Sequence, residues 1–131
     1  MAFDAHEWGR RWSPGSGPTK GDDVAALYAE DAERWDPSIG SRISGKAAIT
    51  AFANGFLGAL PDSIVEMRSI TDDGTRVVVE WTWRGTHTGD MEGWPARGES
   101  VELIGINVLT IVDGLIAGEN SYWDSKQIFG A

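Results

Sequence analysis

The sequence predicts an α+β fold in which three N-terminal helices pack on one face of a curved antiparallel sheet. Up to Pro61 the chain carries helix caps and apolar residues at helical spacing. From Ile64 onward, long runs alternate apolar and polar residues and are separated by short turns. Helices followed by a meander of strands favour this layered arrangement. The 131 residues fit one domain, residues 1–131, with a substantial core.

Three helices are expected in the first half of the chain. The first runs from Asp4 to Trp12, and the second lies within "DDVAALYAED" (22–31), where two aspartates suit the positive end of a helix dipole. The third follows Ser44 as its N-cap and ends at Pro61. Between the second and third helices, "AERWDPSIG" (32–40) predicts a short edge strand that Pro37 stops.

The second half of the chain predicts four antiparallel strands. They are expected at 63–71, 76–87, 100–112 and 115–124. The turn "DDGT", the loop "TGDMEGWPARGE" and the turn "DG" join them in that order, and the last turn predicts a hairpin.

Composition and charge argue against several functions. The absence of cysteine removes disulfides, thiolate catalysis and cysteine-based zinc sites. A net charge of −9 disfavours nucleic acids and anionic membranes as partners. His6 and His87 lie too far apart to form a metal cluster, and no phosphate-binding glycine loop occurs, so we expect no metal and no cofactor. Without a long apolar run or a signal peptide, a cytoplasmic location is expected.

Alternation along the strands predicts which side chains face the helices. On 115–124 we expect Glu119 and Ser121 outside, with the even-numbered residues inside. Together the inward sets predict an apolar hollow with a few polar groups, which is typical of a small-molecule site, and Gly105 and Gly118 leave room in it. The expected apolar walls are Trp81, Trp83, Leu103, Leu109 and Tyr122, and the expected polar members are Asn107, Asn120, Asp124 and His87. A single bulge would reverse such an assignment.

The order of several segments resembles a known family. "ALYAEDA", "WDP", "SGKAAITAFANGFLGALPD", "VVVEWTWRGTHTG", "GINVLTIVDGLI" and "SYWD" occur in the order seen in SnoaL-like proteins of the NTF2-like superfamily. From Asp22 onward the chain resembles this family. The resemblance implies a cone-shaped α+β barrel, a deep pocket between sheet and helices, and homodimers through the outer face of the sheet. Members include polyketide cyclases that close rings by aldol chemistry, and related folds include ketosteroid isomerases and limonene-type epoxide hydrolases.

The resemblance implies that Asp124 is the catalytic acid/base. Asn107 would then hold an enolate oxygen, and His87 would orient substrate or shuttle a proton at the pocket mouth. Each residue also has a purely structural explanation. Asp124 would be a solvated carboxylate at a strand end, Asn107 a buried amide with its hydrogen bonds satisfied, and His87 a loop histidine bonded to backbone. The family also places Trp35 and Asp36 of "WDP" at the pocket edge, where Asp36 is the second choice of acid or else fixes a local turn.

The tryptophans have the same two kinds of interpretation. Trp81 and Trp83 either stack on a flat ligand or simply fill the core. Trp94, in a loop bounded by glycines, either covers the pocket as a lid or anchors the loop.

The function expected from these observations is that of a cofactor-free enzyme of the SnoaL-like type. It would cyclise or isomerise a hydrophobic, carbonyl-bearing small molecule such as a polyketide. The alternatives are a non-catalytic small-molecule binding protein of the same fold and a dimeric scaffold with a filled core. An epoxide hydrolase is disfavoured, because the strand position where the resemblance implies Arg-x-Asp reads Gly105-Ile106-Asn107.

Overall fold

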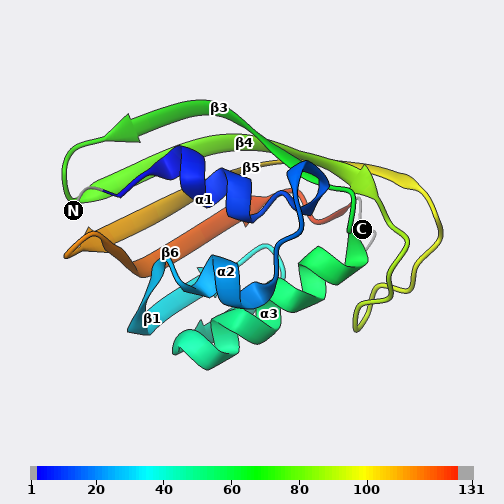
Figure 1. The fold of residues 1–131 in the computed structure, drawn as a ribbon, viewed down its shortest axis with the longest axis horizontal. Helices are drawn as coiled ribbons and strands as arrows, with labels where there is room; N and C mark the ends of the chain where they lie inside the picture. Colours follow the sequence, from blue (N-terminus) through cyan, green and yellow to red (C-terminus); the bar gives the residue numbers. More distant parts are fainter. Residues whose placement is uncertain (1–2, 127–131) are drawn as a thin grey trace.

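A computed structural model describes residues 3–126 and shows one curved six-stranded sheet with the helices on one of its faces (Figure 1). The predicted α+β class is confirmed. The elements in chain order are α1 (Ala5–Arg11), a 3-10 turn η1 (Pro14–Ser16), α2 (Gly21–Ala25), β1 (Tyr28–Asp36), β2 (Ser41–Ser44), α3 (Lys46–Ala59), β3 (Ile64–Asp72), β4 (Arg76–Thr86), β5 (Ser100–Val112) and β6 (Leu115–Trp123).

The strand order is β2-β1-β6-β5-β4-β3. Strands β3 to β6 form the predicted antiparallel meander, whereas β1 runs parallel to β6 and antiparallel to β2. The prediction of β1 as an edge strand was therefore wrong, because β2, which the sequence did not indicate, covers its free side. An interior β1 places Arg34 and Asp36 on the concave face of the sheet.

The second helix is much shorter than predicted. It ends at Ala25, and residues from Tyr28 onward belong to β1. The spacing of Val24, Leu27 and Tyr28 suits a helix, but pairing with β2 and β6 gives this segment backbone partners on both sides, and tertiary context overrides local propensity. The predicted N-cap of α3 also shifts, from Ser44 to Gly45, whose φ of 91° strongly favours glycine.

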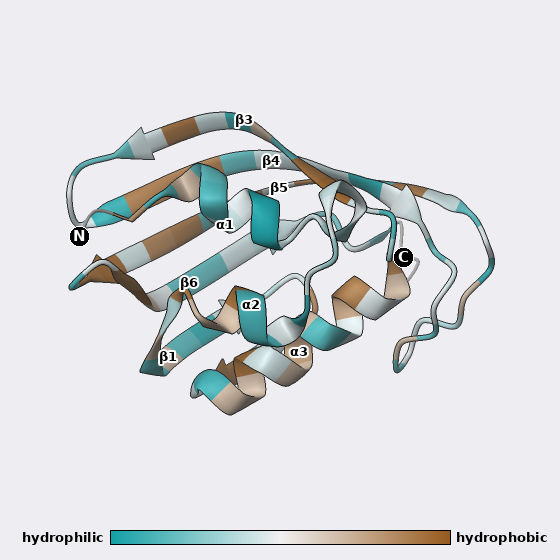
Figure 2. Cartoon of the chain, viewed as in Figure 1, coloured by the Kyte–Doolittle hydropathy of each residue, from teal (hydrophilic) through white to brown (hydrophobic). Residues whose placement is uncertain are grey.

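The core lies between the concave face of the sheet and the three helices. Trp8 of α1, Trp12 just after it and Phe56 of α3 pack against buried residues of β4 and β5, including Trp83 and Leu103. Figure 2 shows hydrophobic and hydrophilic bands alternating along β3 and β4, as expected of a sheet covered on one face only. Within residues 3–126 no helix is long and apolar enough to cross a membrane, and the cytoplasmic location stays a prediction.

A bulge in β6 reverses the predicted orientation of its second half. Pairing with β5 passes from Thr110↔Gly118 to Ile111↔Ile116, which leaves Ala117 as an extra residue in β6. Ile116 faces inward as predicted and is fully buried. Beyond the bulge the inward residues are Glu119, Ser121 and Trp123 rather than the even-numbered ones. The orientation predicted for Asn120, Tyr122 and Asp124 was therefore wrong.

Candidate functional site

A cavity of about 50 Å³ lies at the centre of the concave face, between the sheet, α1 and α3. Seven of its thirteen lining residues are aromatic, so its surface is dominated by ring carbon. The aromatic residues are Trp8, Trp12, Phe52, Phe56, Trp81, Trp83 and Trp123, and the others are Arg34, Asp36, Val65, Leu103, Asn107 and Ser121. The site therefore combines an apolar hollow with a short row of polar groups from β1, β5 and β6, as small-molecule sites do.

Asp36 is the carboxylate on the cavity wall. Its side chain is 1% exposed. The indole Nε1 of Trp123 donates to both of its oxygens, at 3.1 and 3.0 Å, and Nη1 of Arg34 lies 3.4 Å from Oδ2. One shared N–H and one long ion pair leave Asp36 with free acceptor capacity toward the cavity.

A second buried carboxylate, Glu119, lies behind this wall and does not line the cavity. It accepts hydrogen bonds from the Tyr28 hydroxyl at 2.6 Å, Nε of Arg34 at 3.1 Å and Nδ2 of Asn107 at 2.5 Å. Burial and the charge of Glu119 raise the pKa of Tyr28 well above its usual value, so the phenol stays protonated. Burial alone would lower the pKa of Arg34, but Glu119, Tyr28 and Asp36 raise it above its usual value.

Asn107 connects Glu119 to the aromatic wall. Its Oδ1 accepts from Nε1 of Trp81 at 2.8 Å and from Oγ of Ser121 at 3.0 Å, while its Nδ2 donates to Glu119. Asn107 is thus a satisfied buried amide, which agrees with the structural alternative. Gly105 was expected to leave room in the hollow, but a Cβ there would lie 2.5 Å from Cζ2 of Trp81. The indole ring fills that space.

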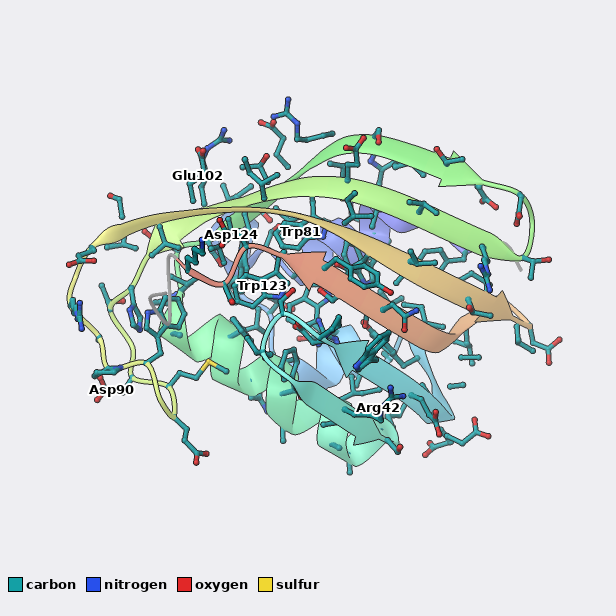
Figure 3. The ribbon with its side chains drawn as sticks, turned by 180° about the vertical axis from the view of Figure 1, so that it is seen from behind. Arg42, Trp81, Asp90, Glu102, Trp123 and Asp124 are labelled. Carbon is teal, nitrogen blue, oxygen red and sulfur yellow. The ribbon has the colours of Figure 1, made fainter. Side chains whose placement is uncertain are left out.

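The cavity brings together only part of the predicted site. Trp81, Trp83, Leu103, Asn107 and Asp36 line it, whereas Leu109 is buried in the core without lining it. Trp81 and Trp123 lie toward the middle of the molecule (Figure 3).

The other predicted wall residues lie on the outer face of the sheet. The rings of Trp35 and Tyr122 pack edge to face there at 6.2 Å, and the guanidinium of Arg42 lies 5.0 Å from the Trp35 ring. Asn120 shares a polar recess with Trp35 and Arg42. These three predicted contacts to a ligand in the central cavity, from Trp35, Tyr122 and Asn120, were wrong because strand alternation and the β6 bulge direct the side chains outward.

Asp124 lies outside the cavity. It follows the end of β6, is exposed, and accepts a hydrogen bond from the backbone N–H of Lys126 at 3.0 Å. Its catalytic role stays a prediction, but its position is that of the solvated strand-end carboxylate that was the alternative.

His87 and Trp94 form a separate stack beside the cavity. Their ring centroids are 3.7 Å apart with an interplanar angle of 29°, and neither residue lines the cavity. The loop is fixed on α3, because the N–H groups of Thr88 and Gly89 both bond to the carbonyl of Ala59. Nε2 of His87 is buried and has no partner among the described residues. Trp94 thus has the position of a loop anchor.

Sequence reasoning missed Arg34, Glu119, Ser121 and Trp123. For Arg34 a signal was present, because in "RWD" the residues on either side of Trp35 share one face of a strand. No such signal was present for Glu119, Ser121 and Trp123. The bulge that turns them inward cannot be detected from the alternation of apolar and polar residues in the sequence. Among residues 3–126 no three side chains of the His, Asp and Glu type come together as a metal site.

Comparisons with known proteins agree with this architecture. A protein from Jannaschia sp. CCS1 named for the SnoaL-like polyketide cyclases superposes with a TM-score of 0.78 at 20% identity, covering 97% of this chain and 92% of that one. A ketosteroid isomerase-like protein from Catenulispora acidiphila DSM 44928, in complex with trimethylamine, gives 0.76 at 17% identity, with coverages of 95% and 87%. The epoxide hydrolase/cyclase-like enzyme SalBIII, of pyran ring formation in salinomycin, gives 0.73 at 20% identity, with coverages of 95% and 90%.

At identities this low, the superpositions show a shared fold and nothing about activity. No curated protein matches the chain. The family model of the SnoaL-like polyketide cyclases, however, matches residues 14–130. The chain therefore belongs to the SnoaL-like polyketide cyclase family.

Proposed function

We propose that this protein is a cofactor-free acid/base enzyme that removes a proton from the carbon next to a carbonyl group, as the first step of a cyclisation or isomerisation. The observation that carries the proposal is the position of Asp36, a buried carboxylate with free acceptor capacity at the wall of an aromatic cavity. A carboxylate in such surroundings is a suitable general base.

Arg34 is the second group of the proposed mechanism. Its guanidinium lies beside Asp36 and lines the same cavity. When Asp36 takes the proton, negative charge develops on the carbonyl oxygen, and a fixed cation in a water-poor site stabilises it. In an isomerisation, protonated Asp36 returns the proton to another carbon. In a cyclisation, the enolate carbon attacks a second carbonyl, and Asp36 gives the proton to the new alkoxide.

Glu119 and Asn107 act in this scheme as positioning residues. Glu119 holds Arg34 through Nε and Asn107 through Nδ2, and Tyr28 completes its hydrogen bonds. The enolate-binding role predicted for Asn107 and the proton-shuttle role predicted for His87 stay predictions.

The cavity limits what can enter it. Pockets for drug-sized ligands measure ~300–1,000 Å³, whereas this cavity measures about 50 Å³. A polycyclic polyketide cannot be enclosed in that space. We therefore propose that the cavity takes a small substrate, or the reacting end of a longer one.

The experiment that tests the proposal follows the exchange of carbon-bound protons with D₂O by ¹H NMR, using acetone, cyclopentanone and acetylacetone. This assay detects proton removal before any product is known. The wild type should accelerate exchange in at least one ketone, and Asp36→Asn should lose roughly 100-fold or more of that acceleration. Equal exchange by the two proteins would contradict the proposal.

An epoxide hydrolase-like activity is the second candidate, and one observation favours it. Arg34-Trp35-Asp36 is an Arg-x-Asp sequence on β1, and Arg34 joins it to a second carboxylate, Glu119, on the neighbouring β6. The resemblance implied such a motif at Gly105-Ile106-Asn107 on β5, where it is absent. Incubation with small epoxides in H₂¹⁸O, with mass analysis of the diol, tests it. If the protein only removes carbon-bound protons, incubation with it should form no more ¹⁸O-labelled diol than incubation without it.

Binding without chemistry is the remaining candidate. The Catenulispora protein of this fold is described in complex with trimethylamine, and a small aromatic cavity suits a carrier as well as an enzyme. A ligand that is retained unchanged after long incubation, with no proton exchange, would favour this candidate.

We also propose a homodimer through the outer face of the sheet. Ile104, Ile106 and Tyr122 are 61%, 40% and 40% exposed and lie together on β5 and β6, where Ile106 is paired with Tyr122. Exposed apolar patches on soluble proteins commonly mark interfaces. The ion pairs of Arg84 with Glu66 and Glu102 border this patch as a polar rim.

A further inference from the structure

We infer that the group entering the central cavity is a small alkylammonium ion, either alone or as part of a larger ligand. The inference rests on the proposed function in taking the cavity as the ligand site, and it adds the charge and size of the group that binds. Three features of the described residues carry it: an unbalanced buried charge, the aromatic lining and the cavity volume.

The buried charges around the cavity do not balance. Asp36, Glu119 and Arg34 are 1%, 2% and 6% exposed, so two carboxylates share one guanidinium. Among the described residues, His87 is the other buried side chain that can carry a positive charge, and it stacks on Trp94 and does not line the cavity. A buried negative charge without a counter-charge is costly, so this arrangement favours a cation as the missing partner.

The uncompensated charge belongs to Asp36 rather than to Glu119. Glu119 has three separate donors, with Arg34 at 3.1 Å. Asp36 has one indole N–H shared between its oxygens, and Arg34 at the longer distance of 3.4 Å. Of the two carboxylates only Asp36 lines the cavity. A cation in the cavity therefore meets the carboxylate that lacks a full counter-charge.

The cavity wall suits a cation for a second reason. Seven of the lining residues are aromatic, and the faces of aromatic rings attract ammonium and guanidinium groups. One ring already does so, since the guanidinium carbon of Arg34 lies 4.2 Å from the centroid of Phe52. An ammonium ion with methyl substituents is matched to this lining, because its carbons contact the rings while its charge faces Asp36.

The volume sets the size of the ion. A water-sized group needs about 10–15 Å³ of such space. The cavity of about 50 Å³ therefore holds on the order of four such groups. Isopropylammonium, with four non-hydrogen atoms, is of this size. Binding of a cation is also compatible with proton removal, because a positive charge next to the reacting carbon stabilises the carbanion that forms.

The test compares two probes of the same shape, isopropylammonium chloride and isopropanol, at pH 7 and low salt. Binding is followed through the indole N–H signals in ¹H–¹⁵N spectra, with sodium chloride as the ionic-strength control. The signal of Trp123 is identified as the one missing from the spectrum of Trp123→Phe. It reports on the site because the Trp123 indole N–H donates to Asp36. We expect a Kd on the order of millimolar for the ammonium ion, at least tenfold weaker binding of the alcohol, and movement of the Trp123 signal.

A variant series locates the charge. Asp36→Asn should weaken isopropylammonium binding at least tenfold, and Asp124→Asn, which removes an exposed carboxylate, should leave it unchanged. Equal affinity for alcohol and ammonium, no detectable binding of either, or full binding by Asp36→Asn would overturn the inference. The probe comparison on wild type alone decides the matter if Asp36→Asn does not fold. Neither probe bears a carbonyl group, so failure here is distinct from failure of ketone proton exchange.

Discussion

The indole N–H of Trp123 donates to both carboxylate oxygens of Asp36, at 3.1 and 3.0 Å, across the parallel pair β1 and β6. This contact exists only because the bulge at Ala117 turns the end of β6 by one residue. The same bulge brings Glu119 to Arg34 and sends Asp124 to the surface. One extra residue in β6 thus turns Glu119 and Trp123 inward and leaves Asp36 of β1 as the carboxylate on the cavity wall.

The buried cluster depends on Arg34, which is the only guanidinium between two buried carboxylates in the part of the chain described. Arg34→Met should lower the free energy of unfolding by roughly 3–5 kcal/mol, because it leaves both carboxylates without their cation. Urea unfolding at pH 7 measures this loss. Adding Glu119→Gln to Arg34→Met should recover part of it, and a single variant as stable as wild type would contradict the account.

Tyr28 makes stability depend on pH in the alkaline range. Burial and Glu119 raise the pKa of Tyr28 in the folded protein, so the folded state keeps its proton while the unfolded chain releases it near pH ~10. The stabilising effect of Tyr28 is complete below that pH and is lost as the pH rises above it.

Tyr28→Phe tests this linkage. The variant should be less stable by about 1–3 kcal/mol at pH 7, where Glu119 loses a donor. The difference between wild type and variant should shrink as the pH rises above about 10. Denaturant unfolding at pH 7, 9 and 10.5 checks both points. A difference that stays constant over this range would show that Tyr28 is not linked to alkaline stability.

Gly105 provides a test of the packing around Trp81. A methyl group there would lie 2.5 Å from Cζ2 of Trp81 and 2.8 Å from the carbonyl oxygen of Tyr122, so Gly105→Ala should cost roughly 1–3 kcal/mol of stability. Gly118→Ala is the matched control on β6, because its methyl would meet only Thr110 at 3.8 Å, an ordinary contact. Thermal unfolding of the two variants should separate them clearly, and equal melting temperatures would argue against this position of the Trp81 ring.

The outer face of the sheet predicts an oligomeric state. Ile104→Lys adds a charge at the most exposed apolar residue of the patch without touching the core. In sedimentation velocity the wild type should run as a dimer and the variant as a monomer at the same concentration, since a buried unpaired charge opposes association. A wild type that is monomeric at high concentration would remove the proposed interface.

Much of the fold could be predicted from sequence, because periodicity and turn chemistry specify it locally. The meander from β3 to β6 and the inward residues of β4 and β5 follow from alternation alone. The interior place of β1 could not be predicted in the same way, since it depends on pairing with β6, which lies far away in sequence. Local spacing around Tyr28 fitted a helix equally well.

The candidate site was harder to predict than the fold for a physical reason. Trp81, Trp83 and Leu103 line the cavity on the side that alternation predicts, because β4 and β5 pair without irregularities there, and their contact with a ligand stays a prediction. Among the polar groups, Ser121 on the cavity wall and Glu119 behind it lie on β6, where the bulge exchanges the two faces. Alternation alone does not reveal such a shift, so it placed Asp124 inward, in agreement with the role that the resemblance implied, and overlooked Glu119 and Trp123.

The most direct test of the central claim compares Asp36→Asn with Asp124→Asn in the D₂O exchange assay, on the ketone that the wild type handles fastest. Both variants replace one carboxylate by an amide of the same size. The account predicts that Asp36→Asn loses roughly 100-fold or more in exchange rate, while Asp124→Asn stays near wild type. A full loss with Asp124→Asn and an unchanged rate with Asp36→Asn would contradict it and return the catalytic role to the exposed end of β6.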